Sequence, residues 1–338
     1  MTDVRIKQGI GREKEHREEA LLLAEDLSVS LREGEAWLPV VYPSDIFVMQ
    51  GGCTGIIGES GCGKSMLCKA LLGLQDPGKW QIRGQVLFRG EHVPIEADDK
   101  MDAFRGRRIS MILQDPLSAF DPRMTIGKHF LEGLWGKQKA LRSLEAVEWL
   151  KRMYMPDPKA VMKRYPFELS GGMLQRVMIA LSLMGEPELL IADEPTTALD
   201  STVQREILWL LARLKEERGL SLLLVSHDLK VISRMANWIY VMYAGRIVER
   251  GPAKELLDHP FHPYTEGLFR SRPAYAKDRL MVMAGRPPRI GEDMGGSCPF
   301  APRCPRADAA CREGEPELKW AERDHFVRCH HWGGRVWA

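Results

Sequence analysis

The sequence has no long hydrophobic run, little net charge and few cysteines. No stretch of about 18 apolar residues occurs, so we expect no segment that spans a bilayer. The charged run from Arg12 to Glu19 leaves the N-terminal region without the apolar core of a signal peptide, and we expect the protein to stay in the cytosol. A net charge of +2 on 338 residues gives no general attraction to nucleic acid or to a membrane surface. Seven cysteines in a cytosolic chain indicate thiols or metal ligands rather than disulfides.

A glycine-rich stretch from Gly58 to Ser65 fits the phosphate-binding pattern G-x-x-x-x-G-K-[ST] at every fixed position. The apolar run 54–57 predicts a buried strand before it, and residues 66–72 predict a helix after it. A helix that starts at a glycine loop aims backbone N–H groups and the positive end of its dipole at one point. We expect Lys64 to reach the β- and γ-phosphates of a nucleotide and the Ser65 hydroxyl to ligate Mg²⁺. A plain glycine turn would explain the glycines but not the Lys-Ser pair. The predicted nucleotide contacts of this loop are Gly58, Ser60, Gly61, Cys62, Gly63, Lys64, Ser65 and Met66.

Polar side chains follow three further apolar runs that we predict as strands, namely Gln114, the Asp193-Glu194 pair and His227. Ligands bind at the carboxyl ends of strands in α/β sheets. Asp193 can hold Mg²⁺ through water, and Glu194 can polarise the water that attacks the γ-phosphate. Gln114 can contact the Mg²⁺ or the attacking water, and His227 can hydrogen-bond the γ-phosphate. Without the phosphate loop, a solvated Gln, two surface acids and a structural His would be the simpler interpretation.

Residues 117–182 have a helical character, with apolar residues at helical spacing from Leu141 to Tyr154. The sequence Ser170-Gly171-Gly172 stands immediately before a long predicted helix and makes a second helix N-terminus suited to an anion. The alternative is a simple N-cap followed by glycines. A second loop of phosphate-binding type in one chain favours the binding role.

An aromatic side chain is expected to stack on the adenine ring of the nucleotide. Trp37 and Tyr42 lie in a predicted strand before the phosphate loop, and we favour Trp37. Either ring could instead fill the core, which is the commoner fate of an aromatic residue near a strand.

Together these residues resemble the nucleotide-binding subunit of an ATP-binding cassette (ABC) transporter, from about Leu21 to Pro273. The signature from Leu169 to Gln175 matches the family's LSGGQ-type motif, with Met173 where Gln is usual, and a loop ending at Asp200 precedes the switch histidine His227. The resemblance implies an α/β fold, a P-loop NTPase core with an antiparallel β-subdomain, an α-helical subdomain and a Cys-rich C-terminal extension. The expected parts are a polar N-terminal tail at 1–19, a nucleotide-binding domain at 20–256 with its helical subdomain at about 117–182, and the extension at 257–338.

The resemblance also implies a shared ATP site. Two cassettes pair head to tail, and ATP lies between the phosphate loop of one and the Ser-Gly-Gly helix of the other. ATP closes the pair and hydrolysis opens it, a motion that can drive membrane subunits docked at the Gln114 loop and the helical subdomain. The partner is a second ABC ATPase subunit, in a homodimer or a heterodimer. The remaining predicted nucleotide contacts are Ser170, Gly171, Gly172, Gln175 and Asp200.

Residues of the C-terminal part indicate which subfamily of ABC transporters the sequence resembles. The segment from Phe261 to Thr265 resembles the HPYT segment of oligopeptide, dipeptide and nickel importers. Cys298, Cys304, Cys311 and Cys329 resemble the extension of peptide-importer ATPases, where four thiolates are thought to hold a 4Fe–4S cluster. By chemistry alone, four cysteines within 32 residues suit zinc or iron–sulfur equally well. The lack of C-x₂-C pairs favours iron–sulfur, and ordinary thiols are the other alternative.

The resemblance implies the energising ATPase of a peptide importer, at the cytoplasmic face of the cell membrane. Its expected partners are two transmembrane permease subunits and an extracytoplasmic solute-binding protein. Import of nickel or a metal chelate is the nearest alternative. A soluble cassette protein acting on ribosomes or DNA usually carries two cassettes or a long coiled coil, and neither is present, so we expect no nucleic-acid partner. An iron–sulfur regulator with a vestigial ATPase is disfavoured by the intact Lys64, Glu194 and His227.

Three departures from the family pattern concern the nucleotide site. The segment between Glu35 and Gly52 is longer than expected, and Gly51-Gly52 replaces the usual Gly-Glu turn, which leaves the stacking residue open. Met66 replaces a common Ser or Thr, so that position offers the phosphates only its backbone N–H.

Overall fold

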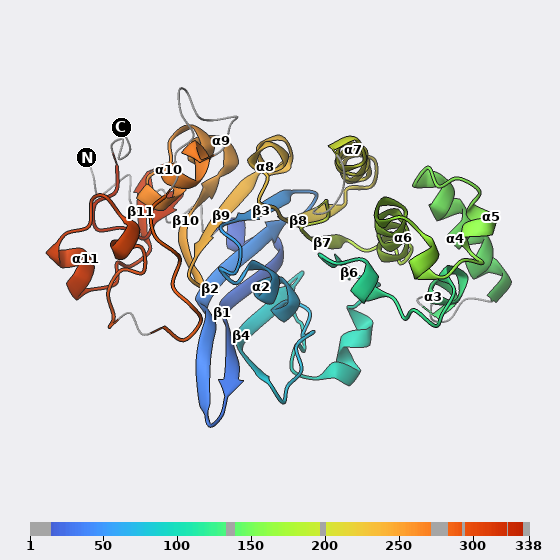
Figure 1. The fold of residues 1–338 in the computed structure, drawn as a ribbon, viewed down its shortest axis with the longest axis horizontal. Helices are drawn as coiled ribbons and strands as arrows, with labels where there is room; N and C mark the ends of the chain where they lie inside the picture. The colour runs from blue at the N-terminus through green and yellow to red at the C-terminus, as the bar shows by residue number, and fades with distance from the viewer. Residues whose placement is uncertain are drawn as a thin grey trace. The chain divides into compact units, whose positions relative to one another are not determined.

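The computed structural model describes residues 15–132, 139–196, 201–271, 283–292, 295–322 and 324–333. Two compact units make up the chain, a first unit of residues 1–98 and 226–338 and a second unit of residues 99–225. Their helices and strands carry the labels of Figure 1. No described helix combines the length and the apolar composition that crossing a membrane requires.

The first unit contains a four-stranded antiparallel sheet of order β2-β1-β4-β5. Its strands are β1 (Ala20–Glu33), β2 (Ala36–Met49), β4 (Trp80–Phe88) and β5 (Glu91–His92). In the sequence, the segments 21–24 and 27–31 are typical of two short strands, but the structure has the single strand β1. Its pairing with β2 shifts register between Ala24 and Leu27, and Asp26 between them has a φ of 49°. This bulge explains the break in the sequence pattern, because an extra residue interrupts the alternation without ending the strand.

Likewise, the sequence segments 37–43 and 46–49 are each typical of a short strand, and the structure joins them into the single strand β2. This explains the unexpected length between Glu35 and Gly52, because those residues form one long arm of the β1–β2 hairpin rather than an inserted element. The sequence Glu33-Gly34-Glu35 is typical of a turn, and the structure confirms it, with Gly34 at a φ of 63°.

A second sheet of the first unit runs in the order β11-β12-β10-β9-β3. Its strands are β3 (Cys53–Ile57), β9 (Trp238–Tyr243), β10 (Arg246–Pro252), β11 (Lys319–Glu322) and β12 (His325–Val327). Every residue of β3 is buried, which confirms the strand predicted before the phosphate loop. The pair Ala244-Gly245 between the segments 239–242 and 246–249 predicts a hairpin, which β9 and β10 confirm. Its turn residues Ala244 and Gly245 have φ values of 46° and 78°, as a two-residue hairpin turn requires.

The C-terminal segments of the first unit continue this sheet. β12 pairs with β10, and β11 pairs with β12. Helices of the described part of the unit include α2 (Lys64–Ala70), α8 (Leu229–Met235), α9 (Ala253–Asp258), α10 (Pro263–Arg270) and α11 (Ala309–Glu313). The predicted extension therefore shares backbone hydrogen bonds with the strand that precedes it.

The second unit has three parallel strands in the order β8-β7-β6. They are β6 (Ile109–Ile112), β7 (Leu189–Asp193) and β8 (Ser221–Val225). Both β7 and β8 are buried at every position, as their continuous apolar runs predict for strands covered on both faces.

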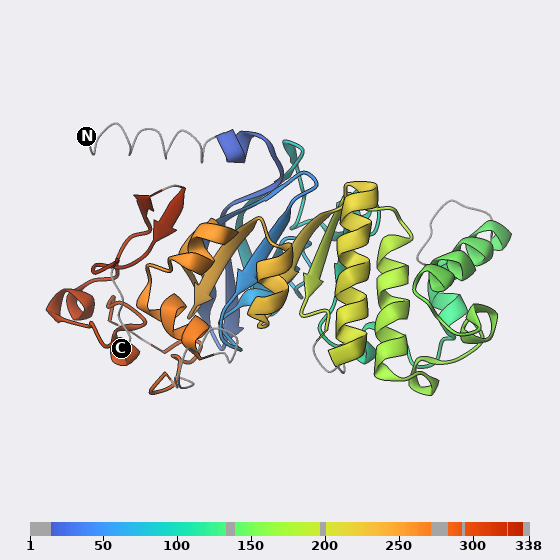
Figure 2. The ribbon, with the colours of Figure 1, turned by 90° about the horizontal axis from the view of Figure 1, so that it is seen from above.

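The second unit also contains several helices. They are α3 (Ile126–Glu132), α4 (Lys139–Arg152), α5 (Pro158–Val161), α6 (Gly171–Leu183) and α7 (Ser201–Arg218). The helices predicted around 141–154 and after Gly172 are thereby confirmed. α6 and α7 lie side by side (Figure 2), and Arg176 of α6 bonds to Glu206 of α7 and to the Met153 carbonyl just after α4.

Candidate functional site

The phosphate loop connects β3 to α2, and its glycines have backbone dihedral angles that other residues do not readily adopt. Gly58 has a φ of 156°, and a Cβ there would lie 2.2 Å from the Met242 carbonyl oxygen. Gly63 caps α2 at a φ of 105°. The loop can therefore bend tightly against β9 and present its backbone N–H groups at the start of α2.

Lys64 is the charged centre of this loop and is almost fully buried. Its Nζ donates to the carbonyl oxygens of Gly58 at 3.0 Å and Glu59 at 2.9 Å. It also lies 3.7 Å from the Cys62 sulfur, whose pKa is raised by burial despite the nearby lysine. The ammonium group is thus held inside the loop by acceptors that a phosphate oxygen can replace. Cys62 remains a neutral packing thiol.

The other predicted residues of the loop lie nearer the solvent. Ser60 and Gly61 are exposed at its tip, whereas Ser65 and Met66 are half-buried in the first turn of α2. This places the Ser65 hydroxyl at the helix N-terminus, where a magnesium ligand is expected.

The two candidate stacking residues differ in what covers them. Tyr42 carries the Arg246 guanidinium over its ring, 3.4 Å from the ring centroid. Trp37 is 39% exposed at the start of β2, opposite Arg32 in the hairpin. Trp37 therefore has the more open ring face, and it stays the predicted stacking residue.

His227 is exposed in the turn between β8 and α8. The turn is fixed on both sides of it. The Ser226 N–H donates to the Ile56 carbonyl at 3.3 Å, and the Asp228 side chain caps α8 by accepting from the Lys230 N–H at 2.9 Å. Ile56 belongs to β3, the strand that leads into the phosphate loop. The residue before His227 is therefore hydrogen-bonded to that strand.

In the second unit, Gln114, Asp193 and Glu194 lie at the ends of the neighbouring strands β6 and β7. The Gln114 Nε2 group donates to Glu194 Oε2 at 3.3 Å. Asp193 is buried as the last residue of β7, while Glu194 is half-buried. Glu194 has a φ of 47°, and its N–H donates to the Val225 carbonyl at 3.0 Å. A left-handed backbone at a residue other than glycine costs about 1 kcal/mol or more, so the neighbouring strand holds this carboxylate in place against strain.

The predicted second anion site forms the start of α6. Ser170 is the N-cap, and its Oγ accepts from the Met173 N–H at 3.3 Å. Gly171 is exposed, and a Cβ added there would meet no other atom within 4 Å. Gln175 is buried on the inner side of the helix. Asp200, also predicted to contact the nucleotide, lies outside the described residues.

The four C-terminal cysteines line one cavity in the first unit, together with His262, Phe300 and Arg306. All four are free thiols. Burial raises the pKa of Cys298 to about 11 and that of Cys329 to about 12, so both are protonated at neutral pH without a metal. Backbone hydrogen bonds from Phe300 and Ala301 act in the opposite direction on Cys298. A bound metal would have to displace these protons.

The spacing of the sulfurs bears on which metal fits. Zinc with sulfur ligands at about 2.3 Å needs sulfurs about 4 Å apart. Among the residues that the structure describes, the only His, Cys, Asp or Glu groups that bring three ligand atoms within 4.8 Å of one another are Asp308, Cys311 and His331. No three of the four cysteine sulfurs meet that distance. A single zinc ion bound by these cysteines would therefore need their sulfurs to move closer together.

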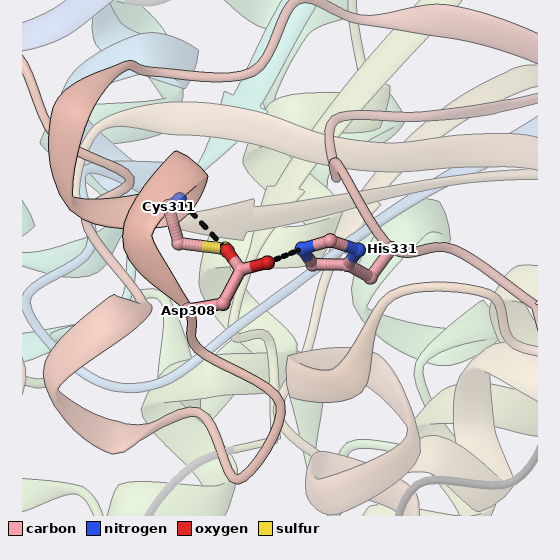
Figure 3. Close-up of side chains that lie close together, drawn as sticks. All are labelled: Asp308, Cys311 and His331. Atoms are coloured by element: carbon pink, nitrogen blue, oxygen red, sulfur yellow. Dashed lines mark hydrogen bonds and ion pairs between the residues drawn. The ribbon is translucent and has the colours of Figure 1, made fainter.

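Asp308 and His331, which the sequence analysis did not single out, lie beside Cys311 (Figure 3). The Asp308 carboxylate lies 2.8 Å from His331 Nε2 and accepts from the Cys311 N–H at 3.2 Å. The hydrogen bond from His331 lowers the pKa of Asp308 to about 2. Their signal in the sequence was available, because Asp308 stands three residues before Cys311 at a helix N-cap and His331 two residues after Cys329.

Two family models match the chain. The one described as ABC transporter matches residues 44–197, and the one described as Oligopeptide/dipeptide transporter, C-terminal region, matches residues 248–311.

Curated relatives match most of the chain. A putative peptide import ATP-binding protein of Brucella melitensis is 40% identical over 301 residues, 88% of this chain and 90% of the relative. The dipeptide transport ATP-binding protein DppD of Escherichia coli is 39% identical over 318 residues, 92% of this chain and 97% of the relative. The oligopeptide transport ATP-binding protein OppD of Lactococcus lactis is 37% identical over 320 residues, 93% of this chain and 95% of the relative.

Solved structures show the same fold. The dimeric ATP-binding cassette MJ0796 in a post-hydrolysis state with ADP and phosphate aligns with a TM-score of 0.61 and 25% identity, covering 69% of this chain and 98% of that one. The cbiO1 protein of Clostridium perfringens, part of the cbiONQ transporter complex, aligns with a TM-score of 0.59 and 23% identity, covering 76% of this chain and 96% of that one.

Proposed function

Because the chain belongs to the ABC transporter family, among the ATP-binding proteins of peptide importers, we propose that it hydrolyses ATP to power the uptake of di- or oligopeptides. The observation that carries this proposal is that one chain holds both the ATPase region and the C-terminal region typical of peptide transporters. The protein works at the cytoplasmic face of the membrane with a second ATPase subunit and two permease subunits. An extracytoplasmic solute-binding protein delivers the peptide.

In this proposal the phosphate loop binds the triphosphate, and the Lys64 ammonium group exchanges its hydrogen-bond acceptors. The ammonium group leaves the carbonyls of Gly58 and Glu59 for the β- and γ-phosphates, so the charge stays paired throughout. The backbone N–H groups at the start of α2 take up the remaining phosphate oxygens. Ser65 and Asp193 are the proposed Mg²⁺ ligands, together with Gln114, and oxygen donors of this kind suit that ion. Trp37 stacks on the adenine ring.

Glu194 is the proposed general base. Its carboxylate is held by the strained backbone of the residue and by the Gln114 amide, so it points in one direction before the substrate arrives. It accepts a proton from the water that attacks the γ-phosphate. His227 hydrogen-bonds the γ-phosphate and detects its loss.

The second subunit completes each site. The exposed start of α6 at Ser170 and Gly171 offers backbone N–H groups and an open surface to the phosphates bound by the other chain. Gly172 belongs to the same turn, and Gln175 and Asp200 are the other proposed contacts. The dimeric cassette that resembles this chain, bound to ADP and phosphate, supports the proposed pairing.

The test of the proposed function is the variant Glu194→Gln. We expect phosphate release to fall at least about 100-fold, because a general base typically contributes that much or more, while binding of Mg-ATP is retained. Lys64→Ala should instead weaken Mg-ATP binding itself. Glu186→Gln, which removes an exposed acid of the same unit paired with Arg218, is the matched control and should behave as wild type. Normal turnover by Glu194→Gln would exclude Glu194 as the base.

We also propose that Cys298, Cys304, Cys311 and Cys329 hold a 4Fe–4S cluster, with zinc as the alternative. The cavity that the four cysteines share supports it. Such a group would supply a stable cross-link between distant parts of the extension. Anaerobically purified protein should contain iron and sulfide and absorb in the visible range. Cys298→Ser should lower both, whereas Cys53→Ala, which removes a buried thiol of β3, should not. Purified protein that contains zinc but no iron would instead indicate a zinc site.

A further inference from the structure

An ion pair joins the cysteine-containing segment to the phosphate loop. Arg303, one residue before Cys304, makes a two-pronged contact with Glu59, the residue after Gly58. Its Nη1 lies 2.7 Å from Glu59 Oε2 and its Nη2 lies 3.0 Å from Glu59 Oε1. The Arg303 side chain is only 4% exposed and that of Glu59 is 23% exposed. A bidentate pair with this little solvent fixes both groups in position as well as in charge.

Glu59 is held at its backbone as well. The Tyr264 hydroxyl, fully buried in α10, accepts the Glu59 N–H at 2.8 Å. The Glu59 carbonyl in turn accepts from the Lys64 ammonium. One residue of the phosphate loop is therefore bound through its side chain, its N–H and its carbonyl, and two of these partners come from the C-terminal region.

Arg303 is positioned by the segment that contains two of the cysteines. It lies in a single 3₁₀ turn, Ala301–Arg303, between Cys298 and Cys304. Its Nε donates to the Ala284 carbonyl at 3.0 Å, and its guanidinium lies 5.9 Å from the Phe300 ring centroid. The cysteines at both ends line the shared cavity, so whatever they bind fixes the ends of this segment.

We propose that Arg303 is a positioning residue that couples the cysteine cavity to the phosphate loop by neutralising and orienting Glu59. This inference rests on the proposed function, because it concerns ATP binding by the same loop. Glu59 brings a negative charge to a loop that binds a polyanion. Arg303 cancels that charge when the cysteine segment is in place.

The coupling follows from electrostatics. Without Arg303, an unpaired carboxylate beside the bound phosphates repels them across a partly buried loop, where charges are screened less than in water. If the cysteine segment becomes less ordered, Arg303 pairs with Glu59 less completely, and the same repulsion weakens ATP binding to a smaller extent. Linkage requires the reverse as well, so ATP binding favours the ordered segment and the group that it holds.

The first experiment measures equilibrium binding of Mg-ATP to the full-length chain. Arg303→Ala should weaken binding about tenfold. Arg303→Lys keeps the charge but not the bidentate geometry of the guanidinium, and it should weaken binding less. Glu59→Gln with Arg303→Ala should restore binding to near the wild-type value, because the repelling carboxylate is gone. Arg286→Ala, which breaks an exposed pair with Glu292 in the same region, is the matched control.

Each outcome of this experiment is informative. Wild-type affinity in Arg303→Ala overturns the proposal, and so does equal weakness of the single and double variants, since the loss would then be structural. If Arg303→Ala does not fold, Arg303→Lys and Glu59→Gln carry the comparison. A wild-type chain that binds no Mg-ATP would instead contradict the proposed function.

The second experiment tests the reverse direction without measuring hydrolysis. The metal retained by the anaerobically purified wild-type chain is measured over time in EDTA and ferricyanide, with Mg²⁺ kept in excess of the EDTA, with and without saturating ATP. We expect ATP to increase the fraction of metal retained in wild type. The increase should disappear in the double variant Glu59→Gln, Arg303→Ala. Equal protection in both proteins, or none in wild type, would overturn the coupling.

Discussion

Acid should destabilise the first unit through His262, the buried residue that caps α10. Its Nδ1 accepts the Tyr264 N–H at 3.0 Å. Burial lowers the pKa of His262 to about 4, although the Glu249 carboxylate opposes this. The folded protein keeps the ring neutral, whereas the unfolded chain protonates it below about pH 6.5. Because the folded-state pKa is the lower one, this contribution to stability is complete above pH 6.5 and is lost as the pH falls towards 4.

The size of the effect follows from the two pKa values. Between pH 7.5 and pH 5 the unfolded state gains about 2 kcal/mol over the folded state from this one group. For a unit of this size, that corresponds to a fall of about 4 to 8 °C in the unfolding midpoint. The loss adds to whatever other groups contribute, so it has to be measured as a difference between two proteins.

The assay is scanning calorimetry of wild type and His262→Asn at pH 7.5, 6 and 5. Asparagine is a good N-cap and can still accept the Tyr264 N–H, but it does not titrate. Wild type should lose about 2 kcal/mol more than the variant over this range. His259→Asn, at an exposed histidine three residues upstream, should follow wild type. Parallel pH profiles for wild type and His262→Asn would refute the assignment.

Two further predictions concern glycines with opposite surroundings. Gly171→Ala should leave thermal stability unchanged or slightly higher, because a Cβ there meets open space and alanine favours a helix by up to about 1 kcal/mol. It should nevertheless reduce ATP hydrolysis by the dimer, and unchanged hydrolysis would count against a phosphate at this helix start. Gly58→Ala should abolish Mg-ATP binding, because its Cβ would lie 2.2 Å from the Met242 carbonyl oxygen. Binding at the wild-type level would show that the loop can relax around the clash.

Local patterns were sufficient to predict the elements that carry the nucleotide site. The buried strand β3 and the helix α2 flank the phosphate loop as expected, since an apolar run, three glycines and a Lys-Ser pair each specify local backbone geometry. The N-cap at Ser170 followed for the same reason, because the cap bond to the Met173 N–H spans three residues. Short-range chemistry of this kind can be inferred directly from a sequence.

Features that depend on distant partners were not predicted. The single long strands β1 and β2 were missed because a bulge resembles a break when the partner strand is unknown. The preference for Trp37 over Tyr42 had no basis in local pattern, and the ring of Tyr42 is covered by Arg246, about 200 residues away in the chain. Asp308 and His331 each stand close to a cysteine in the sequence, but only the fold brings the two side chains together beside Cys311.

The HPYT segment explains how the C-terminal region is packed into the first unit instead of being a separate, loosely attached segment. Glu249, fully buried in β10, accepts the N–H groups of Phe261 and His262 at 2.6 and 3.0 Å and the His325 ring nitrogen at 2.7 Å. Three hydrogen bonds to one buried carboxylate fix the start of α10 between β10 and β12, and leaving such groups unpaired would cost several kcal/mol. The helix so fixed carries the Tyr264 hydroxyl to the backbone of the phosphate loop. A change in the C-terminal strands can therefore reach the phosphate loop through this short helix, whether or not the cysteine cavity is filled.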